Sequence, residues 1–359
     1  MKKCHCVLLV LYIAIFLTGC TIQSRFTDER HNAGRLFQAW HDVSCQEFLQ
    51  NYEATCETVD TVLRLSSALP SLTNRWYHGI AYYTRARAEV RLGKIQQAQQ
   101  DILQALDSGY RNDALVRYDS VLTSKVGGQW FDSVVNQWVL RQQEKKKRWL
   151  IHPMTIMEPT SGTATDLVVG LHGGNGCYEE FSRHFLNLSD SLPYISVFPA
   201  GPIRYSNVTH SWPAVTDGSD SVIIVAIDSC IKLQGSAFRS IYLIGYSQGS
   251  ATAIGYALRH PKQVKGVILF SGFTTEFISD SLLVAAAKHG VSFFALSGTL
   301  DNPAFRESME TFVKRCKQAG VQIEYQERDA MPHEVPLDAE TVVAEVLKKM
   351  SSDHTAGAN

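Results

Sequence analysis

The second half of the chain alternates between short apolar runs and longer amphipathic segments, and this alternation limits the fold more than any other feature of the sequence. The runs are aliphatic and bounded by turn residues, which predicts strands, whereas the longer segments repeat apolar residues at helical spacing. The expected strands are 149–157, 166–171, 194–198, 241–244, 264–270, 291–296 and 322–325, and the expected helices are 220–234, 248–260, 279–289, 302–319 and 339–350. This alternation predicts an α/β fold, with a mostly parallel sheet covered by helices on both faces.

The carboxyl ends of the strands are where such a sheet gathers an active site. After the expected strand 241–244 the chain reads Gly245-Tyr246-Ser247-Gln248-Gly249 and continues into a small-residued helix. The two glycines allow a turn sharp enough to hold the serine in a strained conformation at the strand end. The pentapeptide alone is only moderately specific, so the residues that follow the other strands decide its meaning.

Three other segments supply groups that acyl transfer needs, and each follows an expected strand. The loop 172–176, HGGNG, comes after 166–171, and its small residues allow backbone N–H groups to approach a developing oxyanion. Asp301 follows 291–296 and can orient a histidine, while His333 lies in a loop after 322–325 and can act as a base. The order along the chain is therefore serine, acid and histidine, with a glycine loop before them.

These segments carry a family resemblance that covers residues 150–350. The stretches LHGGNG, IYLIGYSQGS, LSGTLDN with the following KQAGVQIEY, and MPHEVP resemble the α/β-hydrolase superfamily, and most closely its phospholipase/carboxylesterase branch. The resemblance implies an α/β-hydrolase fold that hydrolyses carboxylic esters or thioesters without a cofactor or metal ion.

The resemblance also implies a role for each site residue. Ser247 is the expected nucleophile, Asp301 the acid that orients the histidine, and His333 the base. The expected oxyanion donors are the backbone N–H groups of Gln248 and Gly174. Two alternatives stay open: Asn175 competes with Gly174 for the second donor, and Glu276, one strand earlier than Asp301, competes for the acid.

The N-terminus has the order of a secretory signal. Lys2 and Lys3 precede an apolar run over 7–17 that is too short to span a bilayer as a helix. The Leu-Thr-Gly-Cys sequence that ends at Cys20 resembles the lipobox of bacterial lipoproteins, which implies cleavage before Cys20 and diacylation of its thiol. We therefore expect a signal peptide over 1–20 and a membrane-anchored protein in the bacterial cell envelope, outside the cytoplasm. A plain secretory peptide with an incidental cysteine is the alternative.

Residues 21–148 are expected to be helical. The clearest part is 76–110, where small and aliphatic residues flank a turn at Gly93; it resembles one tetratricopeptide unit, although no second clean copy follows. This region either binds a protein partner or serves as a spacer or cap on the catalytic domain. The basic run 145–148 marks its end, the catalytic domain is expected over 149–350, and 351–359 is expected to be a disordered tail.

Charge and cysteine content exclude several function classes. The formal net charge of -1 gives no electrostatic case for nucleic acid as a partner. Of the eight cysteines, five lie beyond Cys20, and their spacing resembles no zinc site. Cys45 and Cys56 are near enough in sequence for a disulfide, and Cys177, Cys230 and Cys316 complete the five. An odd number leaves at least one cysteine free, and the free cysteines are expected to be buried.

These observations predict a serine ester hydrolase of the carboxylesterase type, acting through a Ser-His-Asp triad on a small-molecule or lipid ester. One alternative is a lipid-anchored binding protein on a catalytically inactive hydrolase fold. Another is a serine peptidase or thioesterase on the same fold.

Overall fold

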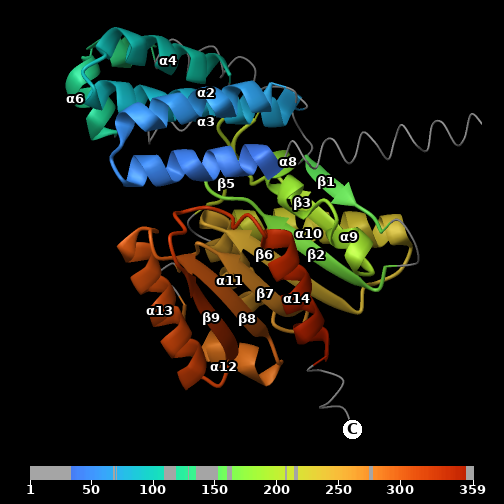
Figure 1. Ribbon diagram of the computed structural model, residues 1–359. Helices are drawn as coiled ribbons and strands as arrows, with labels where there is room; N and C mark the ends of the chain where they lie inside the picture. Colours follow the sequence, from blue (N-terminus) through green and yellow to red (C-terminus); the bar gives the residue numbers. More distant parts are fainter. Residues whose placement is uncertain are drawn as a thin grey trace, which may run out of the picture.

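The computed structural model describes residues 34–67, 69, 71–108, 119–127, 129–134, 153–159, 164–206, 208–213, 217–274 and 278–352. Within them the chain forms a helical layer that lies over one edge of an α/β unit (Figure 1). The expectations for Cys20, for the rival acid Glu276 and for the basic run 145–148 concern residues outside this description.

The α/β unit is built on a seven-stranded sheet with the order β1-β3-β2-β6-β7-β8-β9. The strands are β1 (Met154–Met157), β2 (Asp166–Leu171), β3 (Tyr194–Pro199), β6 (Ser240–Tyr246), β7 (Val264–Phe270), β8 (Ser292–Gly298) and β9 (Gln322–Arg328). β1 runs antiparallel to β3, and every other neighbouring pair is parallel. The expected mostly parallel sheet is confirmed. A separate small hairpin pairs β4 (Ile203–Arg204) with β5 (His210–Ser211).

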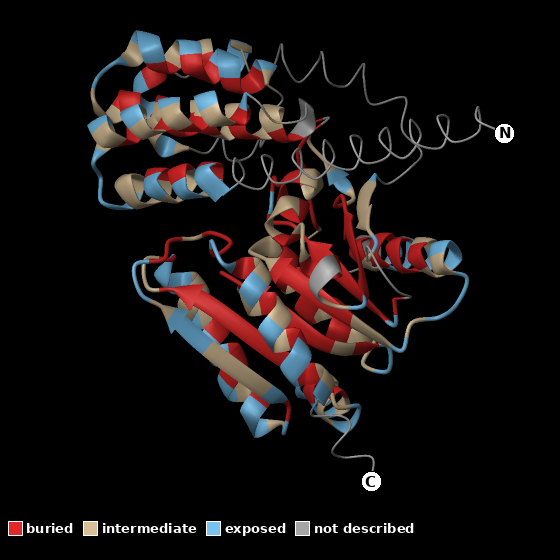
Figure 2. Cartoon of the chain, turned by 45° about the vertical axis from the view of Figure 1, so that its right-hand side comes forward, coloured by how far each residue is buried: buried red, intermediate tan, exposed pale blue. Residues whose placement is uncertain are grey.

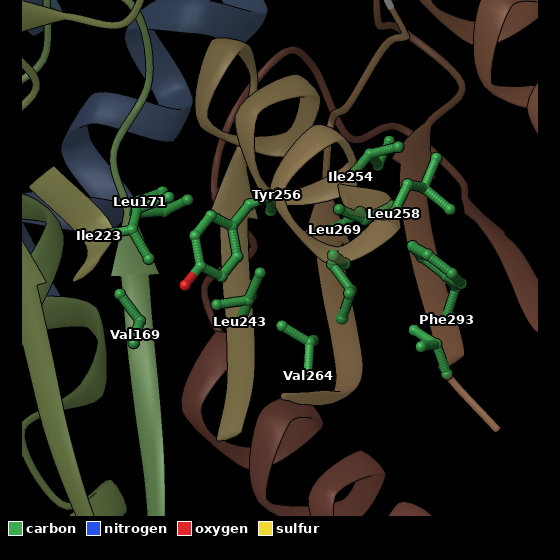
Figure 3. Close-up of a cluster of buried hydrophobic side chains, with 14 of the residues drawn as sticks. Val169, Leu171, Ile223, Leu243, Ile254, Tyr256, Leu258, Val264, Leu269 and Phe293 are labelled. Carbon is green, nitrogen blue, oxygen red and sulfur yellow. The ribbon is translucent and has the colours of Figure 1, made fainter. Parts of the chain in front are cut away.

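Successive residues of the central strands belong to two different cores, one on each face of the sheet. Leu167 and Val169 pack in one apolar cluster and Val168 in the other, which is the two-residue alternation of a strand. The first cluster includes buried residues of α10 (Asp217–Gln234), α11 (Gln248–Arg259), α12 (Asp280–Lys288) and α13 (Pro303–Gln318). Figure 3 shows part of it, with Leu243 and Leu269 of the sheet below Ile254 and Leu258 of α11.

The opposite face is covered by α8 (Tyr178–Ser182), the short 3-10 helix η2 (Arg183–Phe185), α9 (Leu188–Ser191) and α14 (Ala339–Ser352). With both faces covered, the central strands are buried along their length (Figure 2). α14 continues through Ser351, whose hydroxyl lies 3.1 Å from the Tyr194 and Tyr242 hydroxyl oxygens. Ser351 and Ser352 therefore end a helix and do not begin the tail expected from 351.

The helical layer consists of a helix over 34–48, α2 (Tyr52–Ser66), α3 (Ser71–Arg91), α4 (Ile95–Asp107), α6 (Ser120–Val126) and a helix over 129–134. The expected helix, glycine turn and helix of 76–110 is present as α3, Gly93 and α4, and Gly93 has φ +76°. The first of these helices begins at Ser71, within the region expected to be helical. The resemblance to a tetratricopeptide unit stays a prediction.

All five described cysteines are free thiols, so the Cys45–Cys56 pair is not formed. Cys45 instead contacts His41, with its sulfur 3.6 Å from the Nε2 atom. Cys177, Cys230 and Cys316 are buried, as expected of free cysteines, whereas Cys45 and Cys56 are only partly buried. Among the described residues, none of the helices combines the length and the apolar character that crossing a membrane requires.

Candidate active site

Ser247 occupies the sharp turn between β6 and α11, and its backbone conformation is strained. Its φ is 52° and its ψ is -118°, a region that side-chain-bearing residues rarely adopt and that costs about 1–3 kcal/mol. A Cβ at Gly245 would lie 2.6 Å from the Gly249 carbonyl oxygen, and a Cβ at Gly249 would lie 2.1 Å from that of Leu171. Both glycines of the pentapeptide are therefore required by close backbone contacts.

The structure brings Ser247, His333 and Asp301 together in one hydrogen-bonded row. The Ser247 hydroxyl donates to Nε2 of His333 at 2.8 Å, and the Nδ1–H of His333 donates to Oδ1 of Asp301 at 2.7 Å. The Asp301 side chain is 1% exposed and that of His333 is 31% exposed. The carboxylate is thus shielded from water while the imidazole keeps one open side.

The loops that carry Asp301 and His333 are held against each other at the ends of β8 and β9. The N–H of Thr299 donates to the Arg328 carbonyl at 3.0 Å, and the N–H of Leu300 donates to the Met331 carbonyl at 3.0 Å. A Cβ at Gly298 would lie 1.9 Å from the Met331 carbonyl oxygen, so only glycine permits this approach. These backbone contacts bring the aspartate beside the histidine.

Aromatic side chains hold the imidazole of His333 in place. The Tyr246 hydroxyl donates to the His333 carbonyl at 3.0 Å, and the two rings lie 5.5 Å apart. The Phe305 ring lies 5.2 Å from the imidazole on another side and stacks on Phe273 at 4.8 Å. The imidazole of His333 is therefore bordered by aromatic rings.

The loop 172–176 lies against the first residue of α11, as an oxyanion site requires. A Cβ at Gly174 would be 3.0 Å from the Gln248 Oε1 atom, which places the two residues in contact. Among the described residues, the N–H groups of Gly174 and Gln248 find no hydrogen-bond acceptor. The N–H of Asn175, by contrast, already donates to the Ser211 hydroxyl at 2.7 Å. The geometry therefore favours Gly174 over Asn175 as a donor to a ligand.

Gln248 is itself fixed by the segment after β5. Its Oε1 accepts from the Trp212 N–H at 3.0 Å, and its Nε2 donates to the Trp212 carbonyl at 2.8 Å. The Trp212 indole N–H donates to the His172 carbonyl at 2.8 Å. Trp212 and Ser211 thus support the loop 172–176, a role that no pattern in the sequence indicated.

The neutral side chain of His172 anchors the start of the loop 172–176. Its Nδ1–H donates to the Gly173 carbonyl at 2.7 Å, and its Nε2 accepts from the Gly201 N–H at 3.0 Å. Burial lowers the pKa of His172 to about 4, because the interior disfavours the charged imidazolium. At neutral pH the ring can therefore keep both hydrogen bonds.

In the described part of the chain no group of His, Cys, Asp and Glu side chains is arranged to hold a metal ion.

Comparison with known proteins shows that part of the chain matches a family model. Residues 166–294 match the family model described as alpha/beta hydrolase fold, a segment of less than half the chain that includes Ser247 and ends before Asp301 and His333. None of the curated proteins matches the sequence.

Several solved structures resemble the α/β unit. Esterase PE8 is 22% identical, with 55% of this chain and 98% of that chain covered and a TM-score of 0.46. A carboxylesterase from Bacillus cereus is 16% identical, with 59% and 98% covered and a TM-score of 0.46. Acyl-protein thioesterase 2 from Zea mays is 14% identical, with 56% and 99% covered and a TM-score of 0.45.

Proposed function

From the α/β-hydrolase fold of this chain, we propose that the protein is a serine hydrolase that cleaves carboxylic esters through an acyl-enzyme. One observation carries the proposal: the hydrogen-bonded row from Ser247 through His333 to Asp301, with atom separations of 2.8 Å and 2.7 Å. A nucleophile, a base and a buried acid in that order is the arrangement that activates a serine.

In the first half-reaction His333 takes the Ser247 proton at Nε2 as Oγ attacks the ester carbonyl. Asp301 keeps the Nδ1–H tautomer and stabilises the imidazolium that forms. The N–H groups of Gly174 and Gln248 donate to the oxyanion of the tetrahedral intermediate. Gln248 begins α11, so the positive end of that helix lies near the developing charge.

Collapse of the intermediate expels the alcohol, which takes the proton from Nε2 of His333 and leaves the acyl group on Ser247. Water then attacks this acyl-enzyme with His333 as its base, and the serine is restored. The open side of the imidazole, 31% exposed, gives this water a route to Nε2.

A fluorophosphonate probe tests the proposal, because it labels serines that an adjacent base has activated. We expect the wild type to be labelled and to hydrolyse a short nitrophenyl ester, and Ser247→Ala to lose both properties while staying folded. Ser250→Ala is the matched control, since Ser250 is a buried serine of the same turn whose hydroxyl donates to the Phe270 carbonyl at 3.3 Å. An unlabelled wild type would favour the inactive binding protein.

The acid and the substrate need separate comparisons. Asp301→Asn beside Glu276→Gln decides the acid, since only the true partner of His333 should lower the rate strongly. A panel of acetyl, feruloyl and long-chain esters on the purified protein would define the acyl preference.

We also propose that Cys20 is diacylated and tethers the protein to a membrane of the cell envelope, with the helical region over 21–148 and the hydrolase over 149–350 outside the cytoplasm. The lipobox-like sequence before Cys20 supports this proposal. Metabolic labelling with palmitate should tag the wild type, and equal labelling of Cys20→Ala would exclude the anchor.

A further inference from the structure

The helical layer touches the α/β unit at the edge where the strands end (Figure 1). Phe37, in the helix over 34–48, stacks on His184 with ring centroids 4.0 Å apart. The Tyr77 hydroxyl of α3 donates to Glu180 of α8 at 2.9 Å, and Thr73 donates to Glu179 at 3.3 Å. These contacts are aromatic and polar, and they bring the layer close to the loops that carry the site.

One contact reaches the residue that directly follows His333. The Nδ1–H of His41 donates to the carboxylate of Glu334, whose side chain is 8% exposed. On the other side of the ring, Nε2 lies 3.6 Å from the Cys45 sulfur, so the thiol can donate to it. Burial raises the pKa of Cys45, with Glu334 and Asp42 adding to the rise, so the thiol stays protonated. Hydrogen bonds from Cys45 to His41 and from His41 to Glu334 thus link the helical layer to the loop that carries His333.

The hydrolase core holds the backbone of this loop through two carbonyl groups. The Ser271 hydroxyl donates to the Glu334 carbonyl at 3.1 Å, and the Tyr246 hydroxyl donates to the His333 carbonyl at 3.0 Å. Among the described residues, the Glu334 carboxylate takes its hydrogen bond from His41. Burial raises the pKa of Glu334 and the bond from His41 opposes that rise. An unpaired buried carboxylate is energetically unfavourable, so loss of the His41 bond favours movement of the Glu334 side chain toward water.

A second contact reaches the loop 172–176, which carries the proposed oxyanion donor Gly174. The Trp76 indole N–H donates to the Asn175 carbonyl at 3.4 Å, and Asn175 follows Gly174 directly. Trp76 is itself packed edge-on against Tyr77, with ring centroids 4.8 Å apart. The helical layer therefore borders both the loop that carries His333 and the loop 172–176.

We propose that His41 is a positioning residue for His333, acting through Glu334, and that the helical layer completes the catalytic centre. The inference rests on the proposed serine hydrolase function. His333 must keep Nε2 at hydrogen-bond distance from Ser247 and Nδ1 at the same distance from Asp301, so a small shift of its loop disturbs both contacts. A misplacement of about 1 Å can lower the rate of an enzyme about 100-fold.

The experiment measures kcat and KM for a short nitrophenyl ester on the full chain. We expect His41→Ala to lower kcat by about tenfold or more, with KM changed less than about twofold, because a short ester binds to the hydrolase core while the base is misplaced. His41→Asn places an N–H donor near the position of Nδ1 and should recover most of the lost kcat. Tyr77→Phe is the matched control, since it removes an interface hydrogen bond that touches neither catalytic loop.

A double-mutant cycle tests whether His41 acts through Glu334. We expect Glu334→Leu, which removes the acceptor of the His41 bond, to lower kcat as well. His41→Ala with Glu334→Leu should lose no more than the worse single variant, since both changes remove one interaction. If His41→Ala does not fold, Glu334→Leu alone carries the kcat test.

Wild-type kcat in His41→Ala or in Glu334→Leu would overturn the inference, and so would equal losses in His41→Ala and Tyr77→Phe or losses that simply add in the double variant. Failure of the proposed function is distinct, because the wild type would then remain unlabelled by the fluorophosphonate.

Discussion

Acidification should destabilise the protein through His172. This ring is fully buried and its pKa is about 4 in the folded chain, whereas an unfolded histidine titrates near 6.5. The folded-state pKa is the lower of the two, so between these values the unfolded chain binds more protons and the free energy of unfolding falls as the pH falls. The difference between a pKa near 6.5 and one of about 4 corresponds to about 3 kcal/mol of unfolding free energy, lost mostly between pH 6.5 and pH 4.

The assay is urea unfolding at several pH values between 7 and 4, for the wild type and His172→Gln. The variant should be less stable at pH 7, because it loses the Nδ1–H bond to Gly173, yet its free energy of unfolding should fall less steeply with acid. His289→Gln is the matched control, since that ring at the end of α12 stays exposed on folding. Parallel curves for the wild type and His172→Gln would refute the reasoning, because the proton taken up on unfolding would then not belong to His172.

Two further predictions concern the site itself. Asp301→Asn should lower kcat by on the order of 10⁴-fold with little change in the midpoint of thermal unfolding, measured by nitrophenyl ester hydrolysis beside a melting curve; a loss below tenfold would show that another group orients His333. Gly249→Ala should destabilise the fold by about 1–3 kcal/mol and slow fluorophosphonate labelling, because the new Cβ would lie 2.1 Å from the Leu171 carbonyl oxygen. Gly255→Ala in the same helix is its control, since a Cβ there meets the flexible Arg259 guanidinium, and equal losses in the two variants would contradict the steric argument.

The alternation of apolar runs and helical segments was enough to predict the sheet, since each buried strand keeps its own apolar signature. It misjudged where some strands end. β9 continues past the expected 325 to Arg328, and β8 continues to Gly298, because the ladder between them pairs polar and glycine residues that an apolar pattern cannot register. That extension is what brings the Asp301 loop beside the loop of His333.

Local chemistry likewise singled out Ser247, Asp301 and His333 as candidates, because each comes shortly after a strand, and the family resemblance assigned their expected roles. No local sequence pattern identified the residues that hold the site in place. Ser211 and Trp212 act through backbone and side-chain bonds to residues 36 positions away, and His41 meets Glu334 across 293 positions. Contacts of this kind depend on how segments far apart in the sequence pack, which the spacing within one segment does not encode.

The position of β9 at the edge of the sheet has a consequence for the order in which the protein matures. Synthesis completes Ser247 and its turn well before the last strand leaves the ribosome, and β9 must then dock on β8 to bring His333 within reach. A nascent or truncated chain that ends before this strand carries Ser247 without His333 beside it. The contact between Ser247 and His333 therefore forms late, as the final strand joins the sheet.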